Sequence, residues 1–283
     1  MRLESHSIKR LNCAETKLNA QPCYASCRHK FGSALIVFTH YSPVAQFAFC
    51  LRRGRLHPMD GINLSRVTRT YTLGSEEFNA LNKVDLRIAN GDFVAITGPS
   101  GSGKSTLANI IGGLDKPTSG TVNVNGQDLS QLKDAALSAF RNKTIGFVFQ
   151  SFNLKGDSTA LENVMLPLIF AGMSPKKRKV RAAECLERVG MSDRLGHLPN
   201  QLSGGQRQRV AVARALANKP SVILADEPTG NLDSARGAEV MKMLTDLNRD
   251  GITLLVITHD KDVAKHADRR IEVRDGQVHE GKD

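Results

Sequence analysis

The sequence predicts an α/β fold with a mostly parallel sheet, and three observations lead to that fold class. First, the apolar run of residues 92–97 reads as a buried strand, and a glycine-rich loop, residues 98–105, joins it to a segment with helical apolar spacing. Second, helical patterns dominate residues 160–217. Third, other apolar runs have the length and composition of buried strands and end in polar residues; they occupy residues 144–150, 221–227 and 252–259.

The loop itself reads G-P-S-G-S-G-K-S and matches the phosphate-binding pattern G-x-x-x-x-G-K-[ST] at every fixed position. Its glycines let successive backbone N–H groups point inward, and the helix behind the loop adds its positive end. Lys104 can reach the β- and γ-phosphates, and the Ser105 hydroxyl can ligate Mg²⁺. We therefore predict that the chain binds a nucleoside triphosphate.

The positive charge of the chain is concentrated in its first 58 residues. The 283 residues carry a formal net charge of +11. Residues 1–58 hold nine Lys or Arg against two Asp or Glu, whereas residues 59–283 hold thirty against twenty-six, a net charge of only +4. A phosphate-binding domain of such low net charge needs no nucleic-acid partner, and we expect none.

Residues 1–58 also hold four of the five cysteines. Cys23 and Cys27 have no second pair at zinc-ligand spacing, and a protein that consumes nucleoside triphosphates belongs in a reducing compartment, so neither zinc nor disulfides are expected. The apolar stretch of residues 33–51 is interrupted by polar residues and has basic flanks on both sides. We interpret the segment as an N-terminal extension that precedes a true start at Met59; a disordered tail and a membrane anchor are the alternatives.

Two alternating segments precede the phosphate-binding loop. Residues 63–72 and 80–89 read as half-buried strands. Tyr71 lies near the end of the first segment, where its ring could stack on the purine of a bound nucleotide. The alternative is a tyrosine at the surface end of a strand.

The region beyond the loop adds a hairpin, a strand and a helix start. Residues 120–126 read as a strand closed by an Asn-Gly turn. Gln150 ends the strand of residues 144–150, where its amide could touch Mg²⁺ or the attacking water. Ser174 followed by proline opens a helix. We interpret the basic run that continues to Arg181 as a solvated helix face rather than a contact with anionic lipid.

A second candidate anion site lies at residues 202–206, which read L-S-G-G-Q and lead into a long helix. Ser203 is a favourable N-cap, so this helix start resembles the first site physically. Shortly afterwards a buried strand ends in Asp226, placed to hold Mg²⁺, and Glu227, placed to polarise the attacking water. The last buried strand ends in His259, and the carboxyl end of a parallel strand faces the ligand crevice, where this side chain could meet the γ-phosphate.

Taken together, residues from about 62 to 280 resemble the ATPase subunit of an ATP-binding cassette (ABC) transporter. No other phosphate-loop family combines L-S-G-G-Q with a following Asp-Glu strand. The segments G-S-E-E-F-N-A-L, F-Q-S-F-N-L and A-L-E-N-V resemble the branch of lipoprotein release and macrolide export. The motifs that carry the resemblance occur in the order Gly98–Ser105, Gln150, Leu202–Gln206, Asp226 and Glu227, residues 231–233, and His259.

The resemblance implies a two-lobed α/β ATPase with a phosphate-loop core, an antiparallel β subdomain and an α-helical subdomain at about residues 151–217. The ATP-binding domain would span residues 59–283. It implies a homodimer that hydrolyses ATP with Mg²⁺ and drives a separate integral membrane permease. The dimer would lie peripherally on the cytoplasmic face of the bacterial inner membrane and serve the export or release of a lipoprotein, peptide or drug-like substrate.

The resemblance also assigns roles by residue. The catalytic residues would be Glu227, His259 and Gln150, and the Mg²⁺ ligands Ser105, Gln150 and Asp226. Residues that bind ATP in one subunit would be Tyr71, Gly98, Pro99, Ser100, Gly101, Ser102, Gly103, Lys104, Ser105 and Thr106. The signature residues, which contact ATP across the dimer, would be Leu202, Ser203, Gly204, Gly205 and Gln206. Asp233 would lie at the dimer interface, and Gln150 would relay the nucleotide state to the helical subdomain.

Soluble cassette ATPases are the rival class. Those of DNA repair and chromosome structure carry a long coiled coil between their nucleotide motifs, whereas only 122 positions separate Lys104 from Asp226 here, without sustained heptads. Translation factors of this superfamily usually carry two cassettes in one chain, and this chain has one. An iron–sulfur assembly ATPase has the same motif order and is disfavoured only by the closer resemblance to the export branch.

The contact with the permease is expected in the segment of residues 152–172, just after Gln150. Phe152 and Leu154 are the preferred contact residues because they precede the helical pattern. Leu166 and Ile169 are expected to belong to the core of the helical subdomain. A short helix of the partner could lie in a groove here.

Overall fold

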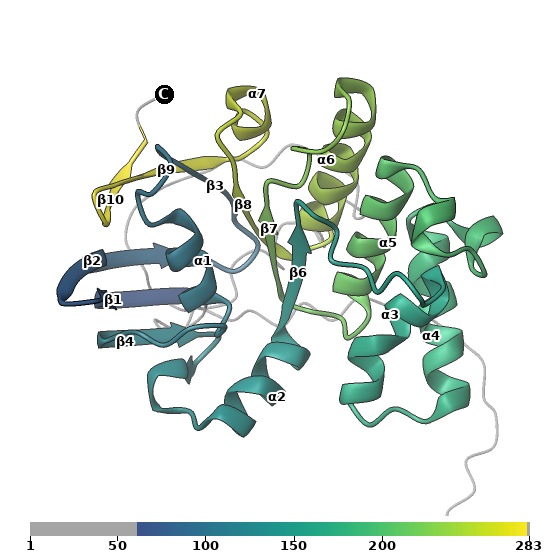
Figure 1. The fold of residues 1–283 in the computed structure, drawn as a ribbon, viewed down its shortest axis with the longest axis horizontal. Coiled ribbons are helices and arrows are strands. Elements are labelled where there is room, and N and C mark those ends of the chain that lie inside the picture. The colour runs from purple at the N-terminus through teal and green to yellow at the C-terminus, as the bar shows by residue number, and fades with distance from the viewer. Residues whose placement is uncertain (1–60, 282–283) are drawn as a thin grey trace, which may run out of the picture. The chain divides into compact units, whose positions relative to one another are not determined.

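The computed structural model describes residues 61–281, which form two sheets with helices around them (Figure 1). The larger sheet has the strand order β10-β9-β3-β8-β7-β6, and all of its neighbouring strands run parallel except β10, which pairs antiparallel with β9. The predicted α/β fold with a mostly parallel sheet is confirmed. The predicted extension of residues 1–58 lies outside the described residues.

The elements have the following bounds. The strands are β1 (Ile62–Leu73), β2 (Glu76–Ile88), β3 (Phe93–Thr97), β4 (Ser119–Val124), β5 (Gln127–Asp128), β6 (Ile145–Phe149), β7 (Val222–Asp226), β8 (Thr253–Ile257), β9 (Arg269–Arg274) and β10 (Gln277–Glu280). The helices are α1 (Lys104–Ile111), α2 (Asp134–Thr144), α3 (Ala160–Phe170), α4 (Pro175–Arg188), α5 (Gly204–Leu216), α6 (Ser234–Arg249) and α7 (Lys261–Ala264).

The inner strands of the larger sheet are buried on both faces. Every residue of β8 is buried, and so are the first four residues of β3 and of β7. Such strands read as continuous apolar runs because helices cover both faces of a parallel sheet. In Figure 1, α1 lies on one side of β3, β8, β7 and β6, and α5 lies on the other. In β3 and β7 only the last residue is partly exposed, and in each strand that residue is polar.

The smaller sheet is antiparallel, in the order β2-β1-β4-β5. β1 and β2 pair as a long hairpin that alternates between buried and exposed residues towards its open end, as half-buried strands do. The predicted Asn-Gly turn joins β4 to β5, and Asn125 and Gly126 both adopt positive φ angles, 51° and 81°. The apolar face of this sheet packs on α1, where Leu107, Ile110 and Ile111 are buried.

Helices α3, α4 and α5 pack together around a second apolar cluster. α3 begins after Thr159, whose hydroxyl accepts from the Glu162 N–H at 3.2 Å while the Glu162 carboxylate accepts from the Thr159 N–H at 2.7 Å. α4 begins at Pro175, as the Ser-Pro pair predicts. Val164 and Leu168 of α3 are fully buried in this cluster.

The helix after the phosphate-binding loop is shorter than its apolar spacing suggests. α1 ends at Ile111, and Leu114, which continues the spacing, is 47% exposed. Gly113 adopts a positive φ of 65°, and the Leu114 N–H donates to the Asn109 carbonyl oxygen at 2.8 Å. This bond pattern closes the helix with a left-handed residue, so Leu114 lies beyond its end.

Among residues 61–281, no helix is both long enough and apolar enough to cross a membrane.

Candidate functional site

The phosphate-binding loop joins β3 to α1, and two of its glycines are required by close backbone approach. Gly98 and Gly103 have φ angles of 140° and 108°. A Cβ atom on Gly98 would collide with the Val273 carbonyl oxygen, and one on Gly103 would collide with the Ala80 carbonyl oxygen. Only glycine fits at these two positions, so the loop is held against β9 and β2 in one shape.

The start of α1 has the properties of an anion site. Its N-cap residue is Gly103, which offers no side-chain acceptor, so the first-turn N–H groups of the helix have no side-chain cap. The Lys104 ammonium donates to the carbonyl oxygens of Gly98 and Pro99 at 2.9 and 2.6 Å. The Ser102 hydroxyl is buried without a hydrogen-bond partner in the described part of the chain. Donors and one cation therefore gather around the loop.

The polar residues predicted for catalysis lie at the carboxyl ends of adjacent strands. Asp226 ends β7, Gln150 follows β6, and His259 follows β8 by two residues. β8 lies directly beside β3, which carries the loop. The parallel register brings these strand ends to the same edge of the sheet, which is where α/β folds bind ligands.

Glu227 and His259 form a close pair at this edge. His259 Nδ1 lies 2.6 Å from Glu227 Oε1, and the His259 N–H donates to the same oxygen at 3.0 Å. The Thr258 hydroxyl donates to Glu227 Oε2 at 3.2 Å. Glu227 adopts a positive φ of 46°, a strained conformation for a non-glycine residue, which its hydrogen bonds hold in place. A carboxylate oriented in this way can accept a proton from water.

The surroundings of the Asp226 carboxyl disfavour its charged form. Burial raises its pKa above the ordinary value, the neighbouring Glu227 carboxylate raises it further, and the Lys104 ammonium opposes both. A carboxylate whose charge is poorly solvated gains from a nearby cation.

This shift predicts how stability depends on pH. Because the folded pKa of Asp226 is raised, the folded chain holds this proton more tightly than the unfolded chain. The folded state loses stability as pH rises from about 4, the unfolded pKa, through the folded pKa. Asp226→Asn should therefore melt at a higher temperature than the parent near pH 7.5 without nucleotide, with the difference vanishing near pH 4. Melting curves at both pH values check this, and a variant that melts lower at pH 7.5 would contradict it.

Gln150 lies against the segment that leads to Asp233. The Gln150 carbonyl oxygen accepts from the Asn231 side-chain amide at 2.9 Å. A Cβ atom on Gly230 would lie 2.6 Å from Gln150 Nε2, so the glycine leaves room for this amide. Asp233 is exposed and caps α6, with its Oδ1 accepting from the Arg236 N–H at 3.0 Å. No pattern in the sequence predicts this contact between Gln150 and the segment before α6.

Tyr71 is half-buried on β1. Its hydroxyl donates to Asp115 Oδ2 at 2.8 Å, and the Arg69 guanidinium lies 4.6 Å from the centre of its ring. Arg69 also pairs with Asp115 at 2.9 Å. The Asp115 carboxylate and the Arg69 guanidinium fix the ring orientation, and because Arg69 covers one face of the ring, a purine could stack only on the opposite face.

The signature residues lie at the start of α5, apart from the phosphate-binding loop. Ser203 is the N-cap, as predicted: its hydroxyl accepts from the Gln206 N–H at 3.3 Å. Gly205 lies against Arg236 of α6, 3.1 Å from the position that a Cβ would take. The pocket beside Ser203 is lined by residues of the segment between α4 and α5, by α5 and by α6, and by no residue of the phosphate-binding loop. One chain therefore does not bring its two anion sites together.

Helix α5 makes three contacts that the sequence did not predict. Gln208, fully buried, donates to the Pro228 carbonyl oxygen at 2.8 Å, next to Glu227. The Arg214 guanidinium donates to the carbonyl oxygens of Phe152 and Asn153, and burial lowers its pKa. The Arg207 guanidinium lies over the Phe152 ring at 5.1 Å. Only Arg214 could have indicated such a contact from the sequence. It lies in an alanine-rich, apolar helix segment, and a cation in a buried helix needs acceptors within the protein.

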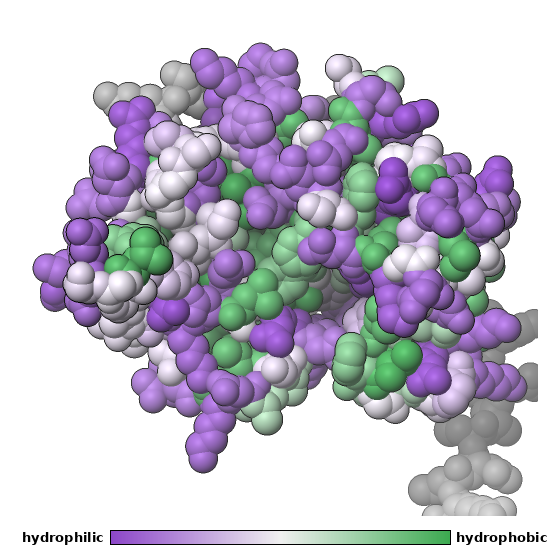
Figure 2. Space-filling view, in the orientation of Figure 1, coloured by the Kyte–Doolittle hydropathy of each residue, from purple (hydrophilic) through white to green (hydrophobic). Residues whose placement is uncertain are grey.

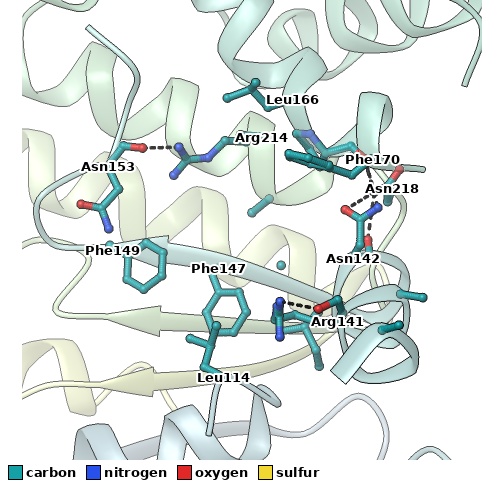
Figure 3. A pocket seen from close by; sticks show the side chains of 17 residues that line it. Leu114, Arg141, Asn142, Phe147, Phe149, Asn153, Leu166, Phe170, Arg214 and Asn218 are labelled. Carbon is teal, nitrogen blue, oxygen red and sulfur yellow. Dashed lines mark hydrogen bonds between the residues drawn. The ribbon is translucent and has the colours of Figure 1, made fainter. Parts of the chain in front are cut away.

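A groove of about 780 Å³ opens between α2, β6, α3 and α5 (Figure 3). Phe147 and Phe149 line it from β6, and Leu166 and Phe170 line it from α3. Figure 2 shows the corresponding hollow in the surface. The residues that line it are Leu114, Ala135, Ser138, Ala139, Arg141, Asn142, Ile145, Gly146, Phe147, Phe149, Asn153, Leu166, Pro167, Phe170, Arg214, Ala215 and Asn218.

The groove corrects the expected placement of apolar residues after Gln150. Leu166 is half-buried in the groove wall and Ile169 is 45% exposed, so the prediction that both belong to the core was wrong. Leu154 packs against the core cluster and does not line the groove. Phe152 lies beneath Arg207 instead. α3 turns Val164 and Leu168 inward, which leaves its other apolar face to the groove and the surface.

The donor set suits a cation that arrives with a nucleotide. No cluster of three or more acidic, histidine or cysteine side chains that could hold a metal occurs within residues 61–281. Mg²⁺ is commonly bound by one or two carboxylates together with substrate phosphates and water. The single carboxylate of Asp226, the Ser105 hydroxyl and the Gln150 amide fit that pattern rather than a resident metal site.

Comparisons with known proteins agree with this geometry. The family described as ABC transporter matches residues 81–230. The ATP-binding protein YknY of Bacillus subtilis is 51% identical over 217 residues, which cover 77% of this chain and 94% of that protein. An uncharacterized ABC transporter ATP-binding protein of Methanocaldococcus jannaschii is 54% identical over 222 residues, covering 77% and 94%.

Two further similarities concern function and structure. The macrolide export ATP-binding/permease protein MacB of Sodalis glossinidius is 50% identical over 217 residues, covering 77% of this chain but only 33% of MacB. A solved dimer of the archaeal cassette, in a post-hydrolysis state bound to ADP and Pi, superposes with a TM-score of 0.72 at 50% identity, covering 78% of this chain and 99% of that one. The predicted resemblance is thereby confirmed. The chain belongs to the ABC transporter family, and it is an ATP-binding subunit that hydrolyses ATP.

Proposed function

We propose that the chain forms a homodimer that uses ATP and Mg²⁺ to drive a separate membrane permease. The observation that carries this proposal is the pair of anion sites that one chain keeps apart: the phosphate-binding loop before α1 and Ser203 at the start of α5. A γ-phosphate held between two helix N-termini needs both sites, so a second copy must supply one of them. The solved archaeal relative is itself a dimer.

Within one chain, the loop residues 98–106 bind the phosphates of ATP. Lys104 exchanges its two carbonyl partners for the β- and γ-phosphate oxygens, since an ammonium gains more from an anion than from neutral acceptors. Tyr71 contacts the base with its ring face. Ser105, Gln150 and Asp226 would hold the Mg²⁺ that accompanies the nucleotide, and the ion would supply positive charge to the phosphates.

Hydrolysis depends on the Glu227–His259 pair. Glu227 orients the attacking water and accepts its proton, because its carboxylate is fixed by hydrogen bonds at the edge where the strands end. His259 keeps that carboxylate in place through Nδ1 and faces the γ-phosphate with the rest of its ring. Gln150 contacts the Mg²⁺ and the water, and its contact with Asn231 carries the nucleotide state towards Asp233 at the dimer interface.

The second copy completes each site. Its signature residues, Leu202 to Gln206, approach the γ-phosphate with the N-terminus of α5. Gly204 and Gly205 let the start of α5 pack closely against Leu232 and Arg236 of the same chain. Closure of the dimer on ATP and reopening after hydrolysis move α5 relative to the sheet.

The permease docks in the groove between α2, β6, α3 and α5. The groove is large enough for a short helix, its walls carry Phe147, Leu166 and Phe170, and Arg214 at its floor holds the segment after Gln150. The subunit then lies peripherally on the cytoplasmic face of the cell membrane. Macrolide export proteins among the relatives support export or release of a lipoprotein, peptide or drug-like substrate.

The groove proposal predicts loss of coupling. Leu166→Ser with Phe170→Ser should retain ATP binding, whereas the ratio of ATPase activity with the reconstituted permease to activity without it should fall towards one. Leu73→Ser is the matched control, because Leu73 is 77% exposed and Phe170 80% exposed, and Leu73 does not line the groove. The measurement is ATPase activity with and without the permease in vesicles. A double variant that the permease stimulates as strongly as the control would exclude the groove.

A further inference from the structure

The tip of the α3–α4 hairpin carries an unusual surface, which we define by Ile169, Phe170 and Val180 together with Lys176, Lys177 and Lys179. Phe170 is 80% exposed, Val180 55% and Ile169 45%. They are half of the six large apolar side chains that are exposed in the described part of the chain. Scattered apolar residues on a surface need no explanation, but a group at one end of a hairpin does.

The three lysines beside this apolar group are all exposed and make no ion pair with a carboxylate of residues 61–281. Arg181, farther along α4, is already engaged: it donates to the carbonyl oxygens of Leu216 and Ala217 and pairs with Glu184. The free positive charge of α4 is thus confined to its first turn and a half.

These lysines lie where positive charge is unfavourable for the helix. The first turn of α4 contains no acidic residue, although the positive end of the helix dipole favours acidic side chains there. The lysine-rich start therefore weakens the isolated helix. A loss of helix stability of this kind is typical of a surface that serves binding. Three lysines would bind a negatively charged partner.

The loop between the helices holds the two groups together. Ala171 to Ser174 close the hairpin, with the Gly172 N–H donating to the Ile169 carbonyl oxygen at 3.0 Å and the Met173 N–H donating to that of Leu168 at 3.1 Å. Phe170, which also lines the groove, is thereby fixed at the same end as the start of α4. Figure 1 shows this end of α3 and α4 away from α6 and α7, and Figure 2 shows exposed hydrophobic residues there beside hydrophilic ones.

We propose that this hairpin tip binds the anionic lipid surface of the membrane, with Phe170 and Val180 entering the interface and Lys176, Lys177 and Lys179 contacting lipid phosphates. The basic run by itself indicated only a solvated helix face. The exposed apolar side chains beside it favour a lipid contact instead, because the apolar groups leave water while the ammonium groups stay with the headgroups. This inference rests on the proposed function only for the orientation of the chain. A permease docked in the groove would turn the hairpin tip, which borders the groove, towards the membrane.

The test uses the full chain and vesicles without a permease. The sequence contains no tryptophan, so Phe170→Trp creates a single fluorescent reporter at the tip. With vesicles of phosphatidylethanolamine and phosphatidylglycerol, its emission should shift to shorter wavelength, and brominated acyl chains should quench it. Val180→Trp provides a second reporter. Reporter titrations with vesicles of phosphatidylcholine alone should show neither effect.

Neutralising the lysines should remove the response. Added to Phe170→Trp, the changes K176Q, K177Q and K179Q should weaken the vesicle affinity by about a hundredfold, since a lysine near an anionic surface contributes about fivefold. The matched control neutralises three other exposed lysines, K242Q in α6, K261Q at the start of α7 and K265Q just after its end, and should keep the affinity within a fewfold.

Other outcomes would overturn the inference. They are a reporter that is neither shifted nor quenched by the anionic vesicles, and quenching in the lysine variant equal to that in the reporter alone. Basal ATPase activity of the Val180→Trp samples reports separately on the proposed function, because the three lysines and Val180 lie outside its machinery.

Discussion

Glu227→Gln should bind ATP and lose nearly all turnover. The amide keeps the size of the carboxylate and can still face His259, but it cannot accept a proton from the attacking water. General-base catalysis commonly contributes about 100- to 10,000-fold, so the rate of ATP hydrolysis should fall by at least about 100-fold. The measurement is steady-state phosphate release together with equilibrium binding of ATP.

The same variant should accumulate a dimer when ATP is present. If ATP closes the dimer and hydrolysis opens it, blocking hydrolysis leaves the closed state. Size-exclusion chromatography should show a larger species with ATP and not with ADP. Glu227→Asp is the control, because it retains a carboxylate at a shorter reach and should retain partial turnover. Parent-like hydrolysis by Glu227→Gln would remove Glu227 from the mechanism.

Ser203→Asp should abolish hydrolysis without unfolding α5. Ser203 caps the helix through its hydroxyl, a contact that contributes about 1 kcal/mol, and aspartate is an equally good cap. The new carboxylate, however, would face the γ-phosphate of ATP on the opposite subunit and repel it. Removing one hydrogen-bond donor that stabilises developing negative charge often lowers the turnover rate about 100-fold or more. We therefore expect at least about a 100-fold loss of turnover.

Two measurements separate this effect from a general defect. ATP affinity of the monomeric chain should be unchanged, because the phosphate-binding loop is intact, and the melting temperature should match that of the parent. Ser203→Thr keeps a hydroxyl cap and should retain most activity. A Ser203→Asp chain that hydrolyses ATP normally would show that the signature does not contact the nucleotide.

The fold was predictable where the pattern of apolar residues was compatible with only one kind of secondary structure. The runs that became β3, β7 and β8 are buried on both faces, and a continuous apolar run bounded by glycine or polar residues allows few alternatives. The two helix starts with recognisable local patterns, at Ser174 followed by proline and at Ser203, were likewise visible in the sequence. The phosphate-binding loop was visible because its glycines are required by sterics.

Helix α3 shows where such prediction fails. It is apolar on all sides, with Leu166, Ile169 and Phe170 as apolar as Val164 and Leu168, so periodicity cannot tell its buried face from its exposed face. The contacts of Gln150 with Asn231 and of Arg214 with Phe152 were equally hidden, because each joins residues more than 60 positions apart through a backbone carbonyl. Every residue has a backbone carbonyl, so the residue type does not reveal which carbonyl accepts a hydrogen bond.

The account's central claim is that each ATP is bound between two copies of the chain, and mixing two inactive variants tests it most directly. Lys104→Ala lacks a working phosphate-binding loop, and Ser203→Asp lacks a working signature. In a mixed dimer, one site combines the intact loop of one chain with the intact signature of the other. Random pairing should then restore ATP hydrolysis to about one quarter of the parent rate, if the sites act independently. Activity in the mixture no higher than in either variant alone would contradict the claim.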